Sequence, residues 1–388
     1  MNYLKRTWAE IDIDALLHNL KVIKENANCD LAAVVKADAY GHGATTVAPV
    51  FENAGVSMFA VSNIEEGIEL RRHGIKKPVL ILGYTPAQYV SELVHNNFIQ
   101  TVYSLSYAES LNAAAEKANV SLECHLKVDS GMSRIGFDCR DESLSDLEDM
   151  KKTAALPRLS VSGAFTHFSS ADSHDKADTE YTDRQYSLFC DVCERLEKSG
   201  IALPYKHCCN SAGTMLNADK HMTMCRPGII LYGLTPADGL NIPYDLKPAM
   251  SFKSTVSMVK TIRKGDSVSY GRHFVAERDM TVATVAVGYA DGYPRVLSGK
   301  GSVIINGRRA PILGNVCMDQ MIVDISGIEN VSVGNEVTLF GDGLPVEEVA
   351  ALCGTINYEI ICGVSRRVPR IYIKDGAETA FVDRLLDE

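Results

Sequence analysis

The residues best suited to chemistry stand where short apolar runs end, and Lys36 is the first of them. It follows the five apolar residues of LAAVV and opens the stretch KADAYGHG. The simplest interpretation is a solvated ammonium at the end of a strand. A partly desolvated lysine amine, however, attacks carbonyl groups and forms a Schiff base. We expect the second role, with Gly41 and Gly43 in a tight turn close to a ligand.

Further polar residues follow later apolar runs and could bind an anionic ligand. Ser211 stands where a helix should begin, and the unpaired N–H groups of a helix start bind phosphate. The backbone N–H groups of Gly228 and Ile229 stand beside Arg226. The other candidates are Lys127 and Arg134 in LKVDSGMSRIGF, His167 in THFSSAD, and Asn210 in HCCNSAG. Together they predict a phosphate-bearing ligand beside a reactive lysine.

Elements that alternate strand and helix must position these residues. Continuous apolar runs, typical of strands buried on both faces, alternate with amphipathic helical patterns. The runs are 31–36, 58–62, 78–83, 99–104, 122–129, 159–168, 204–210 and 228–233. This number of units favours an α/β fold of the (β/α)8 TIM-barrel type over an open doubly wound sheet, which would give similar runs. In a barrel, the carboxyl ends of the strands face the active site.

The pattern changes near residue 240, where helix-length periodicity nearly ends. Short β-branched stretches such as STVSMVKTI, MTVATVAVGY and EVTLF follow, separated by turn signals such as Asn306-Gly307. We therefore predict a barrel domain over residues 1–240 and a mainly-β domain over residues 241–388.

Composition argues against several classes of function. The net charge of −10, without a basic block, argues against a nucleic-acid surface. No run approaches the roughly 18 apolar residues of a membrane span. The first residues also lack the apolar run of a signal peptide, so we expect a cytoplasmic protein with no membrane partner.

The 11 cysteines are scattered along the chain without a disulfide framework. Cys190 and Cys193 have CxxC spacing but lie in a helical pattern, and the adjacent His207, Cys208 and Cys209 have no second pair at zinc-finger spacing. We expect these residues to pack in the core and the chain to bind no metal.

These motifs show that the chain resembles the bacterial alanine racemases over essentially its whole length. The matching motifs occur in the expected order. They are VVKADAYGHG, LKVDSGMSRIGF, THFSSAD, HCCNSAG and RPGIILYGL, followed by SYGRHF (269–274), VGYADGYPR (287–295), GNVCMDQ (314–320) and TINYEI (355–360). The resemblance implies a barrel plus a C-terminal β domain, pyridoxal 5'-phosphate (PLP) as cofactor, and a homodimer with shared active sites.

The resemblance also implies a two-base racemisation of a small amino acid. Lys36 would hold PLP and act as the base on one face of the substrate Cα. Tyr270, supplied across the dimer interface, would be the base on the opposite face, and His167 would hydrogen-bond it. A free tyrosine keeps its proton until about pH 10, so nearby cations or donors must favour the phenolate. Bases on opposite faces are what inversion of a stereocentre requires.

The resemblance implies further contacts to the cofactor and the substrate. Arg226 would face the pyridine nitrogen and, since an arginine does not lose its proton, would leave that nitrogen unprotonated and PLP a weaker electron sink. Arg134 would contact the PLP phenolic oxygen and the substrate carboxylate, helped by the N–H of Met318. The remaining contacts are Tyr40, Asn210, Ser211, Gly228, Ile229 and Tyr358 for the cofactor and its phosphate, and Tyr289 for the substrate.

Lys127 has two interpretations. In alanine racemases the matching lysine is often carbamylated, which gives a negative group that positions the arginine seven residues on, here Arg134. The alternative is an ordinary ammonium beside Asp129, because a modification cannot be seen in a sequence.

Five positions depart from the family pattern, and two of them are Cys208 and Cys209, where alanines are frequent. Ser130 and Ser133 stand where threonine and glycine are usual, and we expect both to be harmless. Asn315 replaces an arginine that often lines the substrate entrance, which should then lose one positive charge. We expect the entrance to stay polar through Asp172, Arg295 and Arg370.

Tyr358 favours alanine as the substrate, because a ring beside the substrate side chain leaves room for a methyl group. Such a pocket rejects an added hydroxyl only about 100-fold, so a serine or broad-specificity racemase is the nearest alternative. A PLP-dependent decarboxylase of similar architecture would not need Tyr270 paired with His167. A non-catalytic PLP carrier of barrel type would lack the β domain. The expected role is the supply of D-alanine for the cell wall.

Overall fold

The chain folds into two compact units, each described here by itself. The structure, a computed structural model, describes residues 4–237, 239–240, 242 and 244–386. Unit 1 takes in the chain up to Leu16, the short segment Tyr40–Gly43, and the chain from Lys247 onward. Unit 2 consists of Leu17–Ala39 and Ala44–Leu246.

Unit 2 is built on a parallel sheet in the order β10-β2-β3-β4-β5-β6-β8-β9. The strands are β2 (Asp30–Val34), β3 (Met58–Val61), β4 (Val79–Ile81), β5 (Phe98–Val102), β6 (Leu122–Asp129), β8 (Leu159–Phe165), β9 (Tyr205–His207) and β10 (Met224–Cys225). β7 (Phe137–Asp138) pairs with β6 off this path. Backbone hydrogen bonds from Thr223 and Arg226 to Lys206 and Cys209 join the β10 segment to the β9 segment. This barrel-like sheet confirms the predicted fold class.

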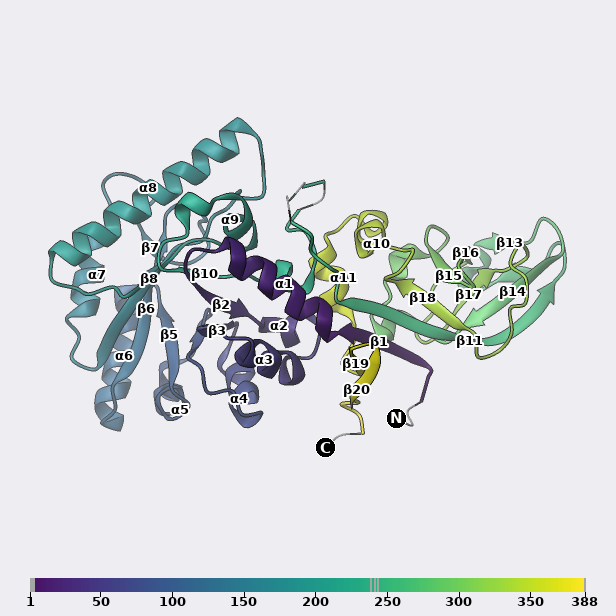
Figure 1. The fold of residues 1–388 in the computed structure, drawn as a ribbon, viewed down its shortest axis with the longest axis horizontal. Helices are drawn as coiled ribbons and strands as arrows, with labels where there is room; N and C mark the ends of the chain where they lie inside the picture. Colours follow the sequence, from purple (N-terminus) through teal and green to yellow (C-terminus); the bar gives the residue numbers. More distant parts are fainter. Residues whose placement is uncertain (1–3, 238, 241, 243, 387–388) are drawn as a thin grey trace. The chain divides into compact units, whose positions relative to one another are not determined.

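Helices connect successive strands of unit 2 (Figure 1). They are α3 (Ala44–Asn53), α4 (Ile64–Arg72), α5 (Val90–His95), α6 (Leu105–Ala118), α7 (Leu147–Ala154), α8 (Lys176–Lys198) and α9 (Ser211–Leu216). Short polar side chains cap the N-termini of α4 and α6. The side-chain oxygens of Asn63 and Ser104 accept hydrogen bonds from the N–H groups of Glu66 and Tyr107, respectively. Each of these two helices buries one apolar stripe.

One predicted strand is wrong. The apolar run 228–233 forms the 3₁₀ helix η3 (Ile229–Tyr232), and the strand that completes the barrel is the shorter β10 just before it. A continuous apolar run does not distinguish a buried strand from a buried helical turn. Here Gly233, with a φ of 82°, ends the turn.

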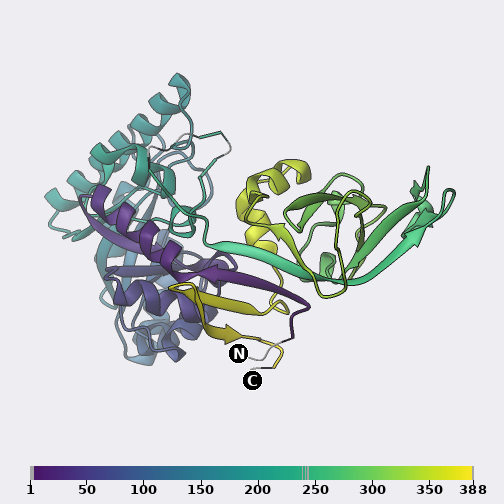
Figure 2. The same cartoon turned by 45° about the vertical axis from the view of Figure 1, so that its right-hand side comes forward.

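Unit 1 is mainly β, as predicted, with a sheet in the order β14-β17-β16-β15-β18-β11-β1-β19-β20. The strands are β1 (Thr7–Asp12), β11 (Met250–Ile262), β14 (Met280–Val285), β15 (Ser302–Ile305), β16 (Arg308–Leu313), β17 (Met321–Asp324), β18 (Glu336–Phe340), β19 (Arg370–Lys374) and β20 (Ala377–Val382). The Asn306-Gly307 pair, with φ of 48° and 73°, makes the predicted tight turn between β15 and β16. β1, drawn in purple, belongs to this unit because it pairs antiparallel with β11 and parallel with β19 (Figure 2).

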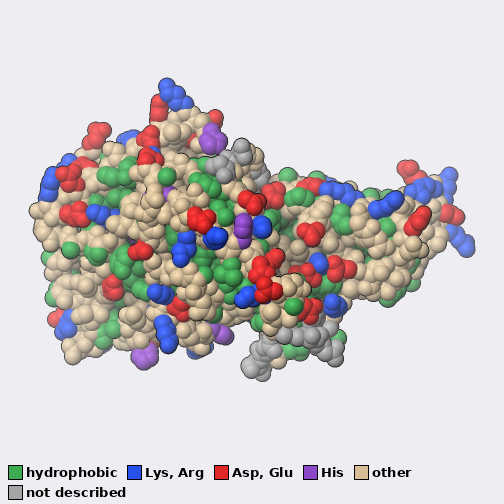
Figure 3. Space-filling model, viewed as in Figure 1, with side chains coloured by type: hydrophobic (Ala, Val, Ile, Leu, Met, Phe, Trp, Pro, Cys, Tyr) green, Lys and Arg blue, Asp and Glu red, His purple; other side chains and the backbone are tan. Residues whose placement is uncertain are grey.

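The surface carries both signs of charge. On the face shown in Figure 3, acidic and basic side chains are interspersed. Among the described residues, no helix is both long enough and apolar enough to cross a bilayer.

Candidate active site

Lys36 lies two residues past the end of β2 and begins a left-handed turn. In α2 (Lys36–Tyr40), the φ angles of Ala37, Asp38 and Ala39 are 52°, 56° and 53°. Left-handed helical residues cost roughly 1–2 kcal/mol each in an L-polypeptide, so other contacts must hold the turn. One of them is the hydrogen bond of 2.8 Å from the Ala44 N–H to the Asp38 carboxylate. Backbone strain of this kind is concentrated at functional sites.

Glu66 on α4 holds the start of this turn. Its two carboxylate oxygens accept hydrogen bonds of 2.7 Å from the N–H groups of Ala37 and Ser62. Bonds to an ionised acceptor are stronger than those between neutral groups. Sequence analysis missed Glu66, because an acidic residue in the first turn of a helix is common and carries no signal of its own.

Tyr40 and Tyr358 are brought together in unit 1. Tyr358 lies on α11 (Asn357–Gly363), and the two ring centroids are 6.0 Å apart. Burial, followed by the neighbouring Tyr358 and Cys362, raises the pKa of Tyr40. The Tyr40 hydroxyl therefore keeps its proton and can donate a hydrogen bond to an anion.

Gly41 and Gly43 make close contacts with the protein itself. Their φ angles are 81° and 90°. A Cβ at Gly41 would collide with the carbonyl oxygen of Ile361, and one at Gly43 with the hydroxyl of Tyr372. Their role is close packing within unit 1, so the predicted tight turn is present but the close neighbour is protein.

Arg226 is buried, at 4% exposure, and its guanidinium binds groups from several strand ends. One terminal nitrogen donates to Nδ1 of His207 at 2.8 Å. The other donates to the Thr166 carbonyl at 2.8 Å and to Nδ1 of His167 at 3.2 Å. Because a guanidinium only donates, both Nδ1 atoms accept, and both imidazoles carry their proton on Nε2.

His125 extends this network, and sequence analysis missed it. Nε2 of His207 donates to Nδ1 of His125 at 3.0 Å. Burial, and then the charge of Arg226, lowers the pKa of His125 to about 3 and that of His207 well below its ordinary range. A strand residue in the apolar run 122–129 gave no signal of this polar role.

The candidate cations converge on His167. Burial and then the charges of Arg226, Lys127, Arg134 and Lys36 lower its pKa well below the ordinary value. His167 is therefore a neutral imidazole with an Nε2–H donor. Basic side chains near this neutral donor suit anionic partners, and a phosphate-bearing cofactor with a carboxylate substrate fits this requirement.

Lys127 is buried in the same region, at 3% exposure. Its ammonium donates to the Val128 carbonyl at 2.8 Å and lies 5.4 Å from the centre of the Phe165 ring. Burial and then the charge of Arg226 lower its pKa to about 7, although Asp129 acts in the opposite direction. A large share of this amine is neutral at neutral pH, and the neutral form is the nucleophile.

The residues predicted to bind phosphate are also close together. The Asn210 side chain caps α9 by accepting from the Gly213 N–H at 2.9 Å. The Ser211 hydroxyl oxygen accepts from the Gly228 N–H at 2.9 Å. The hydroxyl proton of Ser211 can therefore be donated to an anion. Ile229 follows Gly228 in the chain.

Tyr270 lies in unit 1 with 76% of its surface exposed. The Asn315 amide donates to the Tyr270 carbonyl at 2.7 Å, and the Ser269 hydroxyl donates to the Asn315 carbonyl at 2.9 Å. Asn315, considered above only as a lost charge, thus helps to fix the backbone of Tyr270.

Tyr289 and Met318, the predicted substrate contacts of unit 1, lie on adjoining segments. The N–H groups of Tyr289 and Ala290 donate at 3.0 Å to the carbonyls of Cys317 and Met318. A Cβ at Gly288 would collide with both of these carbonyls. Tyr289 is 42% exposed and Met318 53%.

The expectation that Arg370 lines the entrance is wrong. Its side chain is 5% exposed and donates to the backbone carbonyls of Gly41, Val364, Ser365 and Val368. Arg370 therefore joins three segments of unit 1, and its charge is used for structure.

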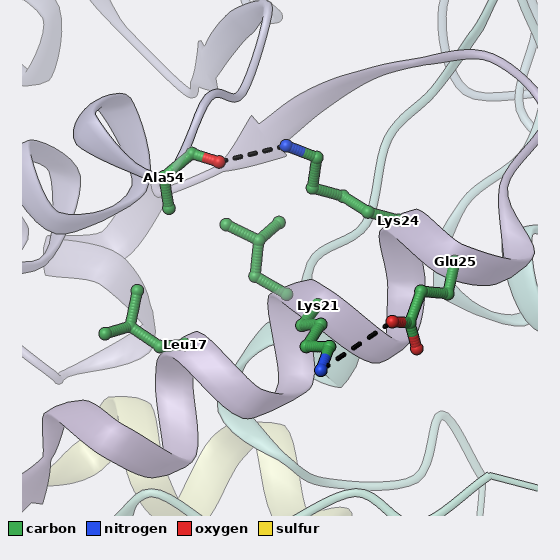
Figure 4. A pocket seen from close by; sticks show the side chains of 6 residues that line it. Leu17, Lys21, Lys24, Glu25 and Ala54 are labelled. Carbon is green, nitrogen blue, oxygen red and sulfur yellow. Dashed lines mark hydrogen bonds and ion pairs between the residues drawn. The ribbon is translucent and has the colours of Figure 1, made fainter.

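The pocket of Figure 4 lies away from these residues. It is lined by Leu17, Leu20, Lys21, Lys24, Glu25 and Ala54 (Figure 4). Lys24 on α1 (Ile13–Asn26) donates to the Ala54 carbonyl at 3.0 Å across it. No candidate residue lines this pocket.

Comparison with known proteins identifies the family. The model of the alanine racemase N-terminal domain matches residues 11–236, and that of the C-terminal domain matches residues 249–372. An alanine racemase of Clostridium tetani is 43% identical over 381 residues, 96% of this chain and 97% of that protein. One of Methanococcus maripaludis is 43% identical over 373 residues, 94% of this chain and 98% of that protein.

Solved structures agree with this result. The alanine racemase of Clostridium difficile 630 has a TM-score of 0.93 at 39% identity, covering 99% of this chain and 100% of that one. The enzyme of Bacillus anthracis with bound L-Ala-P has a TM-score of 0.93 at 35% identity and covers both chains fully. These matches span both units, and the chain therefore belongs to the alanine racemase family.

Proposed function

We propose that this chain interconverts L-alanine and D-alanine with PLP as its cofactor. Family membership makes it a PLP-dependent amino-acid racemase. The single observation that carries the site is the hydrogen bond of buried Arg226 to Nδ1 of His167, because it fixes an Nε2–H donor beside a cation, where anionic ligands would bind. When bound, PLP supplies a carbonyl carbon for amine attachment and a ring that withdraws electrons from the substrate Cα.

Lys36 is the proposed attachment point and the base on one face of the substrate. Its position follows from the turn that begins at this residue, since Glu66 and Asp38 fix the backbone on its C-terminal side. A fixed backbone limits where the amine can reach, and orientation of a reacting group accounts for a large share of enzymatic rate.

Tyr270 of a second copy is the proposed base on the opposite face, which makes the active form a homodimer. Its 76% exposure in the isolated chain supports this assignment, because the side chain is available to another subunit. His167 would donate its Nε2 proton to the tyrosine oxygen and favour the phenolate. Arg226 would enforce that tautomer by occupying Nδ1.

The remaining residues would orient cofactor and substrate. Arg226 would face the pyridine nitrogen, and Arg134 with the Met318 N–H would bind the substrate carboxylate. Lys127, once carbamylated, would place a negative group between these two arginines, whose charges already act on it. The other proposed contacts are Tyr40, Asn210, Ser211, Gly228, Ile229 and Tyr358 for the cofactor and Tyr289 for the substrate.

The test is a racemisation assay on the purified protein with PLP, with L-alanine and L-serine in parallel and chiral chromatography as readout. Fast formation of D-alanine with slow formation of D-serine is expected, because Tyr358 beside the substrate leaves room for a methyl group. If D-serine forms as fast as D-alanine or faster, the protein is a broad-specificity or serine racemase and the alanine assignment is wrong. No racemisation of either would overturn the proposal.

The proposed setting is the cytoplasm, where D-alanine would be made for peptidoglycan. All eleven cysteines are free thiols in the described chain, which suits a reducing compartment. Expression in a bacterium that requires added D-alanine should restore growth without it. Failure of a racemisation-active protein to do so would separate the chemistry from this role.

A further inference from the structure

A group of sulfur and imidazole ligands lies apart from the residues assigned above. Cys29 precedes β2, Cys225 ends β10, and His221 follows the short helix η2 (Ala218–Lys220). One ligand atom from each of the three lies within 4.8 Å of the other two. The two sulfurs are 3.4 Å apart. All three residues belong to unit 2, although 196 positions separate the cysteines in the chain.

His221 is oriented as a metal ligand would be. Its side chain is buried, at 3% exposure, and its Nε2 lies 2.9 Å from the Thr214 carbonyl. A carbonyl only accepts, so Nε2 carries the proton and Nδ1 holds the lone pair. Within the described residues, Nδ1 has no hydrogen-bond partner. Metal-bound histidines typically donate their other N–H to a carbonyl or carboxylate in this way.

The distances suit a tetrahedral ion. Zinc binds thiolate sulfur at about 2.3 Å, which places two sulfurs of one tetrahedron about 3.8 Å apart. The sulfurs of Cys29 and Cys225 need to separate only slightly from their 3.4 Å spacing. Two thiolates would neutralise a dication, and a neutral complex is far cheaper to bury than an isolated charge.

We propose that Cys29, His221 and Cys225 bind one Zn²⁺ ion per chain. A water molecule would complete the coordination as the fourth ligand. Binding forms two sulfur–zinc bonds and one nitrogen–zinc bond and releases the two thiol protons of Cys29 and Cys225 to solvent. No electron is transferred.

The site would join β2 and β10, the first and last barrel strands along the chain, which are neighbours in the sheet. β10 pairs with β2 only through Met224 with Asp30 and Cys225 with Leu31. A zinc ion on Cys29 and Cys225 would add a link next to both pairs. The sequence gives no sign of this group, because 196 positions separate Cys29 from Cys225.

The experiment uses the purified PLP-loaded protein, stripped of metal by a chelator and titrated with Zn²⁺ against a chromogenic competitor. We expect one ion per chain and a rise in Tm on binding. Cys29→Ser should weaken binding at least ~100-fold, because loss of an outer partner alone costs about 10–100-fold. Cys193→Ser, which changes another buried thiol on α8, should bind like the wild type.

Cobalt titration of the wild type gives a second measurement that needs no variant. A tetrahedral site with thiolate ligands should give the intense sulfur-to-cobalt charge-transfer bands. The proposal is overturned if wild-type protein binds no zinc, if Cys29→Ser binds as tightly as Cys193→Ser, or if the cobalt complex lacks those bands. It is equally overturned if the freshly purified protein contains a Cys29–Cys225 disulfide, two mass units lighter, that persists under mild reduction.

Discussion

Arg226 is a permanently charged side chain in a buried position, and its partners are carbonyls and imidazoles. Within the described residues, it forms no ion pair with a carboxylate. Burial, followed by the charge of Arg226, lowers the pKa values of His125, His167 and Lys127. Among the described residues, the candidate site therefore places neutral imidazoles against a buried, permanently charged guanidinium.

The pKa of Lys127 predicts how its carbamylation depends on pH. The neutral amine adds CO₂ and releases one proton, so the adduct should be well populated above about pH 7 and lost as the pH falls below it. ¹³C NMR with labelled bicarbonate measures this directly. A carbamate signal that persists unchanged well below pH 7, or that is absent at pH 8, would contradict the prediction.

The same shift predicts a pH dependence of stability for unmodified protein. The pKa of Lys127 is about 7 in the fold against an ordinary value of 10.5. Between these values the unfolded chain holds the additional proton, so this residue makes the free energy of unfolding rise with pH across that window. Denaturant unfolding of CO₂-free protein at pH 7 and 9 should show a steeper rise than in Lys127→Met, which cannot titrate.

Tyr270→Phe should affect the two directions of racemisation unequally. Loss of a general base costs typically 10²–10⁴-fold, and only proton abstraction on the tyrosine face should lose it directly. Exchange of the Cα hydrogen with deuterated solvent, followed separately for L- and D-alanine, measures each face. Equal residual exchange from both enantiomers would refute the assignment.

Ser133 shows why glycine is usual at its position, because its φ is 55°. A residue with a side chain costs roughly 1–2 kcal/mol in the left-handed conformation, and glycine avoids this cost. Part of the gain is lost, because glycine increases the conformational entropy of the unfolded chain. Ser133→Gly should therefore raise the free energy of unfolding by about 0.5–1 kcal/mol. Ser130→Gly is the control, since Ser130 lacks a positive φ and its hydroxyl is 2.7 Å from that of Thr166, so it should lower stability.

At the scale of elements, the left-handed turn after β2 depends on a helix elsewhere in unit 2. Glu66→Gln keeps the shape but loses the charge and one acceptor, so about 1–2 kcal/mol of stability should be lost. Glu65→Gln, on the exposed side of the same first turn of α4, should be neutral. Thermal unfolding compares the two, and equal Tm values would show that the carboxylate of Glu66 does not hold the turn.

The sequence predicts the positions of most barrel strands well, apart from the run 228–233, and the special backbone of this region poorly. Runs such as 122–129 become strands because burial on both faces selects continuous apolar stretches. The turn at Ala37–Ala39 has no such signal, since alanine is the best helix former and does not favour φ near +50°. Glu66, His125 and Asn315 were missed because their roles depend on contacts made only in the folded chain.

At the scale of the whole molecule, the predicted boundary at residue 240 separates two patterns along the sequence. Unit 1 of the fold, however, also includes β1 and Tyr40–Gly43. Tyr40 and Lys36 thus fall in different units although they are four positions apart. In the isolated chain, Tyr270, Tyr289 and Met318 are exposed. The assignment of Tyr270 to a partner's site can be tested with mixed dimers.

Co-expression of Lys36→Ala and Tyr270→Phe chains should restore activity. In a mixed dimer one site carries both changes and the other carries neither, whereas each variant alone has no intact site. Random pairing gives half mixed dimers, so about a quarter of wild-type activity is expected. With differently tagged chains the mixed dimer can be purified, and an inactive mixed dimer would show that both bases come from one chain.

The pairing of β1 with β11 and β19 also bears on how the chain is made. β1 is synthesised first, but its partners begin at residues 250 and 370. The ribosome therefore completes the barrel strands while β1 is still an unpaired edge, and such edges promote aggregation. Unit 2 can form during translation, whereas the sheet of unit 1 must wait until nearly the last residues have emerged. Slow release of the C-terminus, or its truncation, should thus expose the first strand of the chain rather than the last.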